Sequence, residues 1–203
     1  MPAAEPVIRI VDDDTSFRRA VARLLTASGF IVKTFASAAG FLAEPEFDVP
    51  GCILLDLQMP GLDGLGLQEV LAKEGCRLPV IFLSGHGDIP ATVCAMRKGA
   101  EDFLTKSAPK EELLDAVRRA LARDAASRLA VADQESVRQR FAALTPRERE
   151  VLERVVQGRL NKQIAADLGI HERTVKLHRT SVTTKLGVPS VAELTRLWMQ
   201  ADL

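Results

Sequence analysis

With 203 residues, 47% of them hydrophobic, the chain is long enough for one large domain or two small ones and can bury a core without disulfides or structural metals. Three widely spaced cysteines, no signal-peptide pattern and no apolar run of about 18 residues exclude a disulfide framework and a membrane span, so we expect a cytoplasmic protein. The net charge is zero, but residues 141–203 carry three more basic than acidic residues, which fits a nucleic-acid partner for the tail and equally fits ordinary scatter.

Residues 1–122 alternate short apolar runs with longer amphipathic runs. We expect strands at residues 7–11, 30–35, 52–55, 80–83 and 102–105, and helices between them at 15–28, 38–44, 64–73 and 88–98. Strands that alternate with helices indicate a parallel sheet, and strands that are apolar at nearly every position are typical of a sheet covered on both faces. The pattern therefore predicts a doubly wound α/β domain.

The stretch from Lys110 to Leu144 contains neither glycine nor proline. Its first part has an apolar face, and beyond Arg123 the pattern becomes alanine-rich and polar. We expect a fifth helix that either continues through residues 123–142 as a helical linker or breaks near residues 124–134.

The last part of the chain, residues 143–203, lacks strand signals. Two capping-box patterns, Thr145–Glu148 and Ser190–Glu193, each mark a helix start, and the first has proline directly after the cap. Helical segments at residues 162–168 and 172–186 lie between them. An all-α bundle of about four helices is therefore predicted.

Chemically active side chains stand at the ends of four predicted strands. The first strand ends at Asp12 and Asp13, the third at Asp56, the fourth at Ser84 and the fifth at Lys106. In an open parallel sheet the carboxyl ends of the strands form one edge, where ligands bind, so these groups are expected to converge. For any one residue a polar loop is the simpler interpretation, but all five together favour a site.

Three clustered carboxylates repel one another unless a cation offsets their charge, and Mg²⁺ suits a site of few carboxylates and waters. The set predicts phosphoryl transfer, with Asp56 as nucleophile, Asp12 and Asp13 holding the metal, and Ser84 and Lys106 contacting phosphoryl oxygens. The acidic turn after the first strand excludes a dinucleotide-binding fold, which needs glycines there.

Four segments of the first domain resemble the receiver domains of response regulators: residues 10–13, 55–61, 83–88 and 102–106. The Ser-Gly-His-Gly-Asp run in the third is especially similar to the FixJ group. The resemblance covers about residues 5–122 and implies a (βα)5 fold of strand order 2-1-3-4-5.

The same resemblance implies roles for single residues. Asp56 would accept a phosphoryl group from a sensor histidine kinase, and the backbone carbonyl of Gln58 would complete the Mg²⁺ shell. Ser84 would move toward the phosphoryl group as Phe103 turns inward, although Phe103 as a plain core residue is the alternative. Gln58 and His86 would flank the path of the attacking water, where they either tune the lifetime of the phosphoaspartate or have no such influence.

One departure from the receiver pattern concerns the loop after Lys106. Most receivers have proline directly after this lysine, in a cis bond, whereas here Ser107, Ala108 and Pro109 follow. A non-proline cis bond costs about 2.5–4 kcal/mol. Either that strain is retained or the loop has a different geometry.

Residues 161–186 have helix-turn-helix spacing, with Gly169 at the turn and a second helix that would enter the major groove. Residues 144–198 resemble the LuxR/NarL-type DNA-binding domain, through residues 144–148, 161–165, 174–178 and 185–188. The resemblance implies base contacts from Lys176, Leu177 and Thr180. It places nearer the phosphates Asn161, Lys162, Arg173, Thr174, His178, Arg179 and Lys185.

Alternatives remain open in this domain. Each basic residue, taken alone, is also explained by a solvated helix face. His171 stands where relatives usually have a capping serine, and we expect it to face solvent or phosphate rather than to bind a metal. An apolar stripe on the last helix either packs in the core or pairs two copies on a two-fold DNA site; its residues are Val191, Leu194, Thr195, Leu197 and Trp198.

These observations predict a phosphorylation-controlled transcription regulator that is not an enzyme. We expect a sensor histidine kinase and double-stranded DNA as partners, a homodimer when Asp56 is phosphorylated, RNA polymerase as a candidate partner, and no membrane contact. A regulator with a degenerate receiver that binds DNA without phosphorylation is the alternative. A haloacid-dehalogenase-like phosphohydrolase is disfavoured because Gln58 stands where such enzymes need a second acid.

Overall fold

The computed structural model describes residues 4–44, 46–85 and 89–200. The chain divides into two compact units, Met1–Ser127 and Arg128–Leu203. None of the helices within the described residues combines the length and the apolar composition needed to cross a bilayer.

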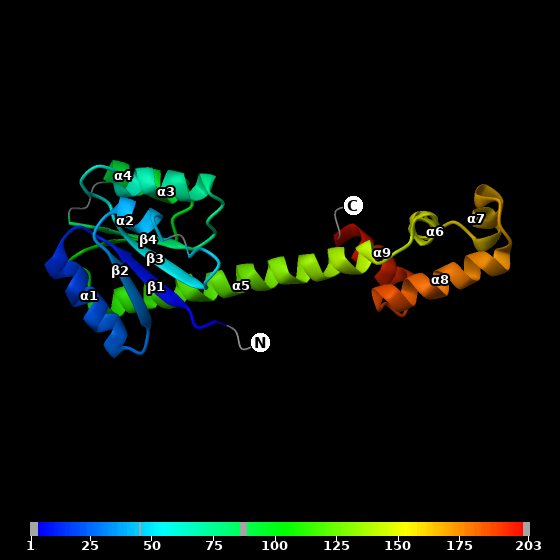
Figure 1. Ribbon diagram of the computed structural model, residues 1–203, viewed down its shortest axis with the longest axis horizontal. Coiled ribbons are helices and arrows are strands. Elements are labelled where there is room, and N and C mark those ends of the chain that lie inside the picture. The colour runs from blue at the N-terminus through cyan, green and yellow to red at the C-terminus, as the bar shows by residue number, and fades with distance from the viewer. Residues whose placement is uncertain (1–3, 45, 86–88, 201–203) are drawn as a thin grey trace. The chain divides into compact units, whose positions relative to one another are not determined.

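The first unit is built on five parallel strands in the order β2-β1-β3-β4-β5, which confirms the predicted fold (Figure 1). The strands are β1 (Val7–Val11), β2 (Ile31–Phe35), β3 (Gly51–Asp56), β4 (Val80–Ser84) and β5 (Asp102–Thr105). Every residue of β1, β3 and β4 is buried, as their continuous apolar runs predicted for strands covered on both faces.

Helices cover both faces of this sheet. They are α1 (Thr15–Ala27), α2 (Ala38–Leu42), α3 (Gly64–Lys73), α4 (Ile89–Arg97) and the start of α5 (Lys110–Ala142). On one face α1 and α5 pack on the strands, as Leu25 and Val117 show, and on the other face Phe41, Leu67 and Ala95 bring α2, α3 and α4 into contact with the sheet. Side-chain caps fix the starts of three of these helices, from Asp14, Ser37 and Asp63.

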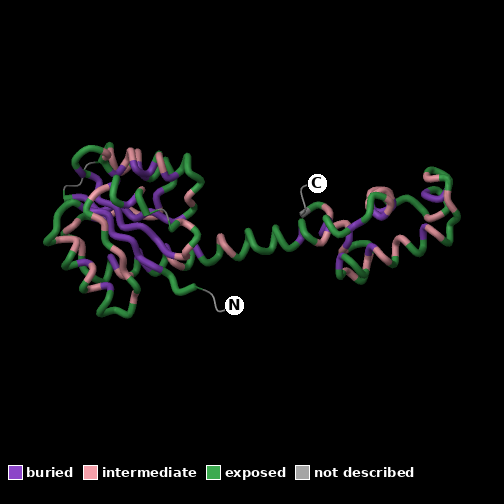
Figure 2. Tube along the Cα trace, viewed as in Figure 1, coloured by how far each residue is buried: buried purple, intermediate pink, exposed green. Residues whose placement is uncertain are grey.

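Helix α5 is continuous over 33 residues, so the break considered near residues 124–134 is absent and residues 123–142 are helical throughout. Residues 129–136 are all exposed, as the green segment of Figure 2 shows. The following buried residues of α5, Val137 and Phe141, belong to the core of the second unit.

The second unit contains the end of α5 and four further helices, as predicted. They are α6 (Pro146–Val156), α7 (Asn161–Leu168), α8 (Glu172–Leu186) and α9 (Val191–Gln200). The Thr145–Glu148 capping box is complete, whereas at Ser190–Glu193 the Ser190 Oγ accepts a hydrogen bond from the Glu193 backbone at 3.2 Å. On α9, Leu194 and Leu197 are buried and Trp198 packs edge-on against Phe141 at 5.7 Å, so most of the predicted apolar stripe lies in the core.

Candidate functional site

The carboxyl ends of β1 and β3 bring three aspartates together. Single carboxylate oxygens of Asp12, Asp13 and Asp56 all lie within 4.8 Å of one another. Asp12 is fully buried, Asp56 is 4% exposed and Asp13 is exposed. The Asp12 carboxylate is held in place because its Oδ1 accepts a hydrogen bond from the backbone N–H of Asp14 at 2.8 Å. The predicted acidic cluster therefore exists, with one carboxylate open to solvent.

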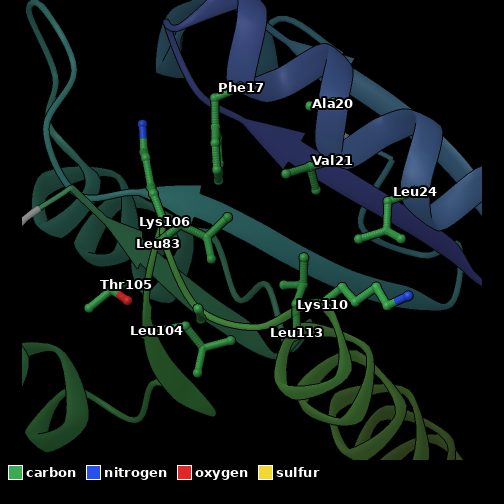
Figure 3. A pocket seen from close by; sticks show the side chains of 11 residues that line it. Phe17, Ala20, Val21, Leu24, Leu83, Leu104, Thr105, Lys106, Lys110 and Leu113 are labelled. Atoms are coloured by element: carbon green, nitrogen blue, oxygen red, sulfur yellow. The ribbon is translucent and has the colours of Figure 1, made fainter.

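The ammonium of Lys106 reaches this cluster from the end of β5. Its Nζ lies 2.8 Å from Asp12 Oδ2 and 3.0 Å from Asp56 Oδ2, and it hydrogen-bonds the latter. The aliphatic stem runs beside the ring of Phe17 on α1, whose centroid is 4.8 Å from Nζ (Figure 3). Both the carboxylates and the ring favour a charged, fixed ammonium at this point.

The electrostatics of the site follow from burial and like charge. Burial raises the pKa of Asp56, and the neighbouring Asp12 raises it further, while the Lys106 hydrogen bond works in the opposite direction. Burial alone would lower the pKa of Lys106, but the carboxylates of Asp12 and Asp56 outweigh it and the pKa is raised. The surroundings therefore favour the charged form of Lys106 and disfavour the charged form of Asp56.

The donor set fits a hard divalent cation. The Lys106 ammonium contacts both buried carboxylates, at Asp12 Oδ2 and Asp56 Oδ2, while Asp13 is exposed beside them. Three clustered carboxylates beside this ammonium leave a net negative charge that oxygen-coordinated Mg²⁺ would offset. The Gln58 backbone N–H donates to Asp56 Oδ1 at 3.3 Å, and the role of its carbonyl stays a prediction.

The two predicted switch residues lie on the neighbouring strands. Ser84 is 4% exposed at the end of β4, and it is paired in register with Thr105 on β5. Phe103 is half-buried and stacks on Phe82 at 6.1 Å. His86 lies outside the described residues.

The loop after Lys106 differs from the usual receiver geometry. Peptide bonds between described residues are all trans, including the one between Lys106 and Ser107. The Ala108 backbone donates to the Thr105 carbonyl at 2.9 Å, which closes a short turn before α5. Of the two possibilities, the chain therefore takes the altered loop.

In the second unit, α7 and α8 form a helix-turn-helix. Gly169 ends α7 with a φ of 63°, the left-handed conformation that glycine adopts without strain, and the Ile170 N–H returns to the Ala165 carbonyl at 3.0 Å. The exposed His171 begins α8 without a side-chain hydrogen bond to the helix, as expected for a poor cap.

The predicted DNA contacts differ in exposure. Leu177 is 64% exposed, and Lys162, Arg173, Lys176, Thr180 and Lys185 are also exposed. Asn161, Thr174, His178 and Arg179 are half-buried. An exposed leucine on an otherwise polar helix face has no role in the core of its own unit, so it is suited to an external contact.

Two contacts of these side chains join α8 to other parts of the unit. Arg179 Nη1 donates to Asn161 Oδ1 at 2.8 Å and so joins α8 to the start of α7. Lys185 Nζ lies 2.7 Å from Glu148 Oε2 and donates to the Ala143 carbonyl at 3.2 Å.

Glu148 connects α6 to α8, a structural role that the sequence pattern did not reveal. Its pKa is lowered from 4.5 to about 2, first by the Lys185 hydrogen bond, then by those from Ser181 and the Thr145 backbone. The capping-box pattern identified its helix start but not its contacts with α8, which lie more than 30 residues away along the chain.

Comparison with known proteins agrees with both units. Residues 8–118 match the family model of the response regulator receiver domain, and residues 142–198 match that of bacterial regulatory proteins of the luxR family.

Two curated relatives and two solved structures match nearly the whole chain. The transcriptional regulatory protein FixJ of Azorhizobium caulinodans is 43% identical over 206 residues, which cover 100% of this chain and 96% of the relative. Nodulation protein W of Bradyrhizobium diazoefficiens is 42% identical over 195 residues, covering 96% and 86%. The structure of the response regulator StyR has a TM-score of 0.90 at 43% identity, covering 97% and 100%. Full-length FixJ from B. japonicum has a TM-score of 0.61 at 35% identity, covering 98% of both chains.

Proposed function

The chain belongs to the response regulators that join a receiver to a LuxR-type DNA-binding domain, and we propose that phosphorylation of Asp56 by a sensor histidine kinase controls its transcriptional activity. The observation that carries this proposal is the contact of Lys106 Nζ with both Asp12 and Asp56 beside the exposed Asp13. That arrangement supplies a fixed cation and three carboxylates, one of them the nucleophile, at the carboxyl ends of the strands.

In the proposed step, a carboxylate oxygen of Asp56 attacks the phosphorus of a phosphohistidine on the kinase. An O–P bond forms as the N–P bond breaks, and the imidazole leaves. Lys106 and Ser84 would hold phosphoryl oxygens, and Asp12, Asp13, Asp56 and the Gln58 carbonyl would hold Mg²⁺. A bound Mg²⁺ supplies positive charge that offsets the clustered carboxylates and the incoming phosphoryl oxygens.

The proposed output of this step is a homodimer formed through α4, β5 and α5. Three apolar side chains lie exposed along α4 at helical spacing: Ile89 at 75%, Val93 at 45% and Met96 at 44%. An exposed apolar stripe is the kind of surface that a second copy would cover. Ser84 and Phe103 stand at the adjoining strands, so a shift of either would change the packing beneath this face.

We further propose that α8 reads DNA in the major groove. Lys176, Leu177 and Thr180 would contact base edges. Exposed and half-buried polar residues around them would contact phosphates, and these are Asn161, Lys162, Arg173, Thr174, His178 and Arg179. Lys185, predicted as a further phosphate contact, would have to divide its charge between DNA and Glu148. RNA polymerase stays a candidate partner.

Selection of bound DNA from a random pool, with and without acetyl phosphate and Mg²⁺, tests the proposal. The wild-type chain should become labelled, dimerise and bind the selected site more tightly, whereas Asp56→Asn should do none of these. Glu74→Gln, at an exposed glutamate that follows α3 and lies outside the proposed dimer face, serves as the control and should behave as wild type. If Asp56→Asn acquires the label and dimerises like the wild type, the proposal is wrong. If the wild type binds equally with and without the phosphodonor, the phosphorylation-independent alternative holds.

A further inference from the structure

A second group of buried charges lies at the amino ends of β1 and β3, at the opposite edge of the sheet from the acidic site. Arg9 on β1 is 1% exposed and Asp124 on α5 is 3% exposed. Phosphoryl transfer uses neither of them. Buried charges are costly unless hydrogen bonds and opposite charges compensate them, so their partners indicate what the fold gains from them.

Arg9 holds the segment that leads into β3. Its Nη1 donates to the Val7 carbonyl at 3.0 Å, and its Nη2 donates to the carbonyls of Glu46 and Val49 at 2.7 and 3.1 Å. One side chain thus fixes three backbone positions from inside the sheet.

Asp124 joins α5 to the start of β3. Its Oδ2 accepts the backbone N–H of Gly51, the first residue of β3, at 2.9 Å. Gly51 has a φ of 149°, and a Cβ there would lie 1.9 Å from the Val7 carbonyl oxygen and 2.8 Å from Arg9 Nη1. The opposite charges of Arg9 and Asp124 therefore both border one glycine, which no larger residue can replace without displacing them.

The position of Asp124 along α5 gives this contact its significance. Ala116, Val117 and Ala120 on the preceding turns are fully buried against the sheet. After Asp124, residues 129–136 are exposed on all sides of the helix. Asp124 is thus the last buried residue before the exposed part of the helix that leads into the second unit.

We propose that Arg9, Gly51 and Asp124 form an anchor that positions α5 at its exit from the receiver, and that this anchor carries the phosphorylation state of the receiver into the helix. The first part of the inference concerns the resting protein alone, and the second part rests on the proposed function. The start of α5 lines the same pocket as Lys106, and Asp124 ties the helix to β3 fourteen residues after Lys110. A shift at the start of α5 therefore acts on the anchor through one continuous helix.

Three variants of the full-length chain test the anchor. Asp124→Leu removes both the charge and the acceptor for Gly51, whereas Asp124→Asn removes the charge and keeps an oxygen acceptor. Asp133→Leu is the matched control, since Asp133 lies on the exposed part of the same helix. Each is measured without phosphodonor by hydrogen exchange of the α5 amides, and with acetyl phosphate and Mg²⁺ by labelling of Asp56 and by DNA affinity.

Asp124→Leu should raise amide exchange around residues 121–128 by about tenfold or more, while Asp133→Leu leaves that stretch unchanged. Asp56 should still be labelled, but the gain in DNA affinity on phosphorylation should fall about fivefold or more, a change within the usual range of coupling between sites. If Asp124→Leu does not fold, the Asn variant should show the same two changes in smaller degree.

Unchanged exchange in both Asp124 variants would overturn the anchor. Raised exchange with an undiminished gain in DNA affinity would overturn its role in carrying the signal. A wild-type chain whose DNA affinity ignores the phosphodonor would instead overturn the proposed function together with that role, and the exchange measurement would still decide whether the anchor exists.

Discussion

Replacing Glu148 by glutamine should destabilise the DNA-binding unit at neutral pH. Glu148 is 5% exposed, and its carboxylate accepts hydrogen bonds from Lys185, Ser181 and the Thr145 backbone. Glutamine keeps the size of the side chain but loses the charge, and its NH₂ group would turn a donor toward Lys185 or Ser181. Both partners lie on α8, so the loss should also loosen the recognition helix.

The size of the effect follows from the pKa of Glu148, which is lowered from 4.5 to about 2. Each pKa unit corresponds to about 1.4 kcal/mol, which sets a limit of about 3.4 kcal/mol for the preference of the folded state for the carboxylate. The Lys185 side chain is 35% exposed, so solvent screens its interaction with Glu148, and we expect about 1–2 kcal/mol.

The sign of the pH dependence is fixed by the direction of the shift. A carboxyl whose pKa is lowered on folding contributes its stability above the unfolded pKa near 4.5 and loses it as the pH falls toward about 2. The difference between wild type and Glu148→Gln should therefore be full at pH 7 and reduced by about half near pH 3.

The single tryptophan of the chain makes this measurable in the full-length protein. Trp198 packs against Phe141 in the core of the second unit, so its fluorescence follows the unfolding of that unit in urea. Glu150→Gln is the matched control, because Glu150 is 45% exposed and pairs with Arg147 on the surface; it should change stability by less than about 0.5 kcal/mol. Equal urea midpoints for Glu148→Gln and wild type at pH 7, or a difference that does not shrink on acidification, would refute the reasoning.

Three further predictions concern the acidic site and the recognition helix. Without Mg²⁺, Asp56→Asn should raise the melting temperature at pH 7 by a few degrees. Burial and the neighbouring Asp12 raise the pKa of Asp56, so the ionised carboxylate opposes folding at this pH. An unchanged or lower melting temperature would contradict this. Mg²⁺ at about 100 times its Kd should stabilise the wild type by about 2.7 kcal/mol in thermal unfolding. Asp13→Asn should need higher Mg²⁺ concentrations for the same stabilisation. If the wild type and Asp13→Asn respond equally to Mg²⁺, Asp13 is not a ligand of the metal. Leu177→Ala should leave the Trp198-detected stability within about 0.5 kcal/mol of wild type but weaken binding to the selected DNA about fivefold or more, and unaltered affinity would exclude Leu177 from the base contacts.

The sheet and the acidic cluster could be predicted because local signals specify them. Buried parallel strands are continuous apolar runs, and the sheet topology brings the residues at their carboxyl ends to one edge, so Asp12, Asp56 and Lys106 could be placed together without coordinates. The altered loop after Lys106 could be suspected only from a missing proline, since nothing in the sequence specifies the turn that replaces it.

Helix α5 shows where local signals fail. Residues 129–136 have no buried face, so the periodicity that identifies helices is absent and a break was an equal alternative. Nothing in the polar sequence beyond Arg123 marks Asp124 as a buried residue, because its partner Gly51 is 73 residues earlier and a backbone N–H leaves no trace in the sequence.

For the basic residues of the DNA-binding unit, too, the sequence does not reveal which group each charge contacts. A sequence pattern places the positive charge of Lys185 on the recognition helix, but it does not say whether that charge faces phosphate or a carboxylate of its own unit. The structure gives Lys185 the buried Glu148 as a partner at 2.7 Å, whereas Lys162, another proposed phosphate contact, is exposed near the start of α7. Because an exposed ammonium can reach a phosphate without leaving a buried carboxylate, Lys162 should account for about one unit of the slope of log affinity against log salt, and Lys185 for much less. Measuring that slope for Lys162→Met and Lys185→Met separates a residue that binds DNA from one that holds the helix in place, and equal slopes for the two variants would show that Lys185 leaves Glu148 when DNA binds.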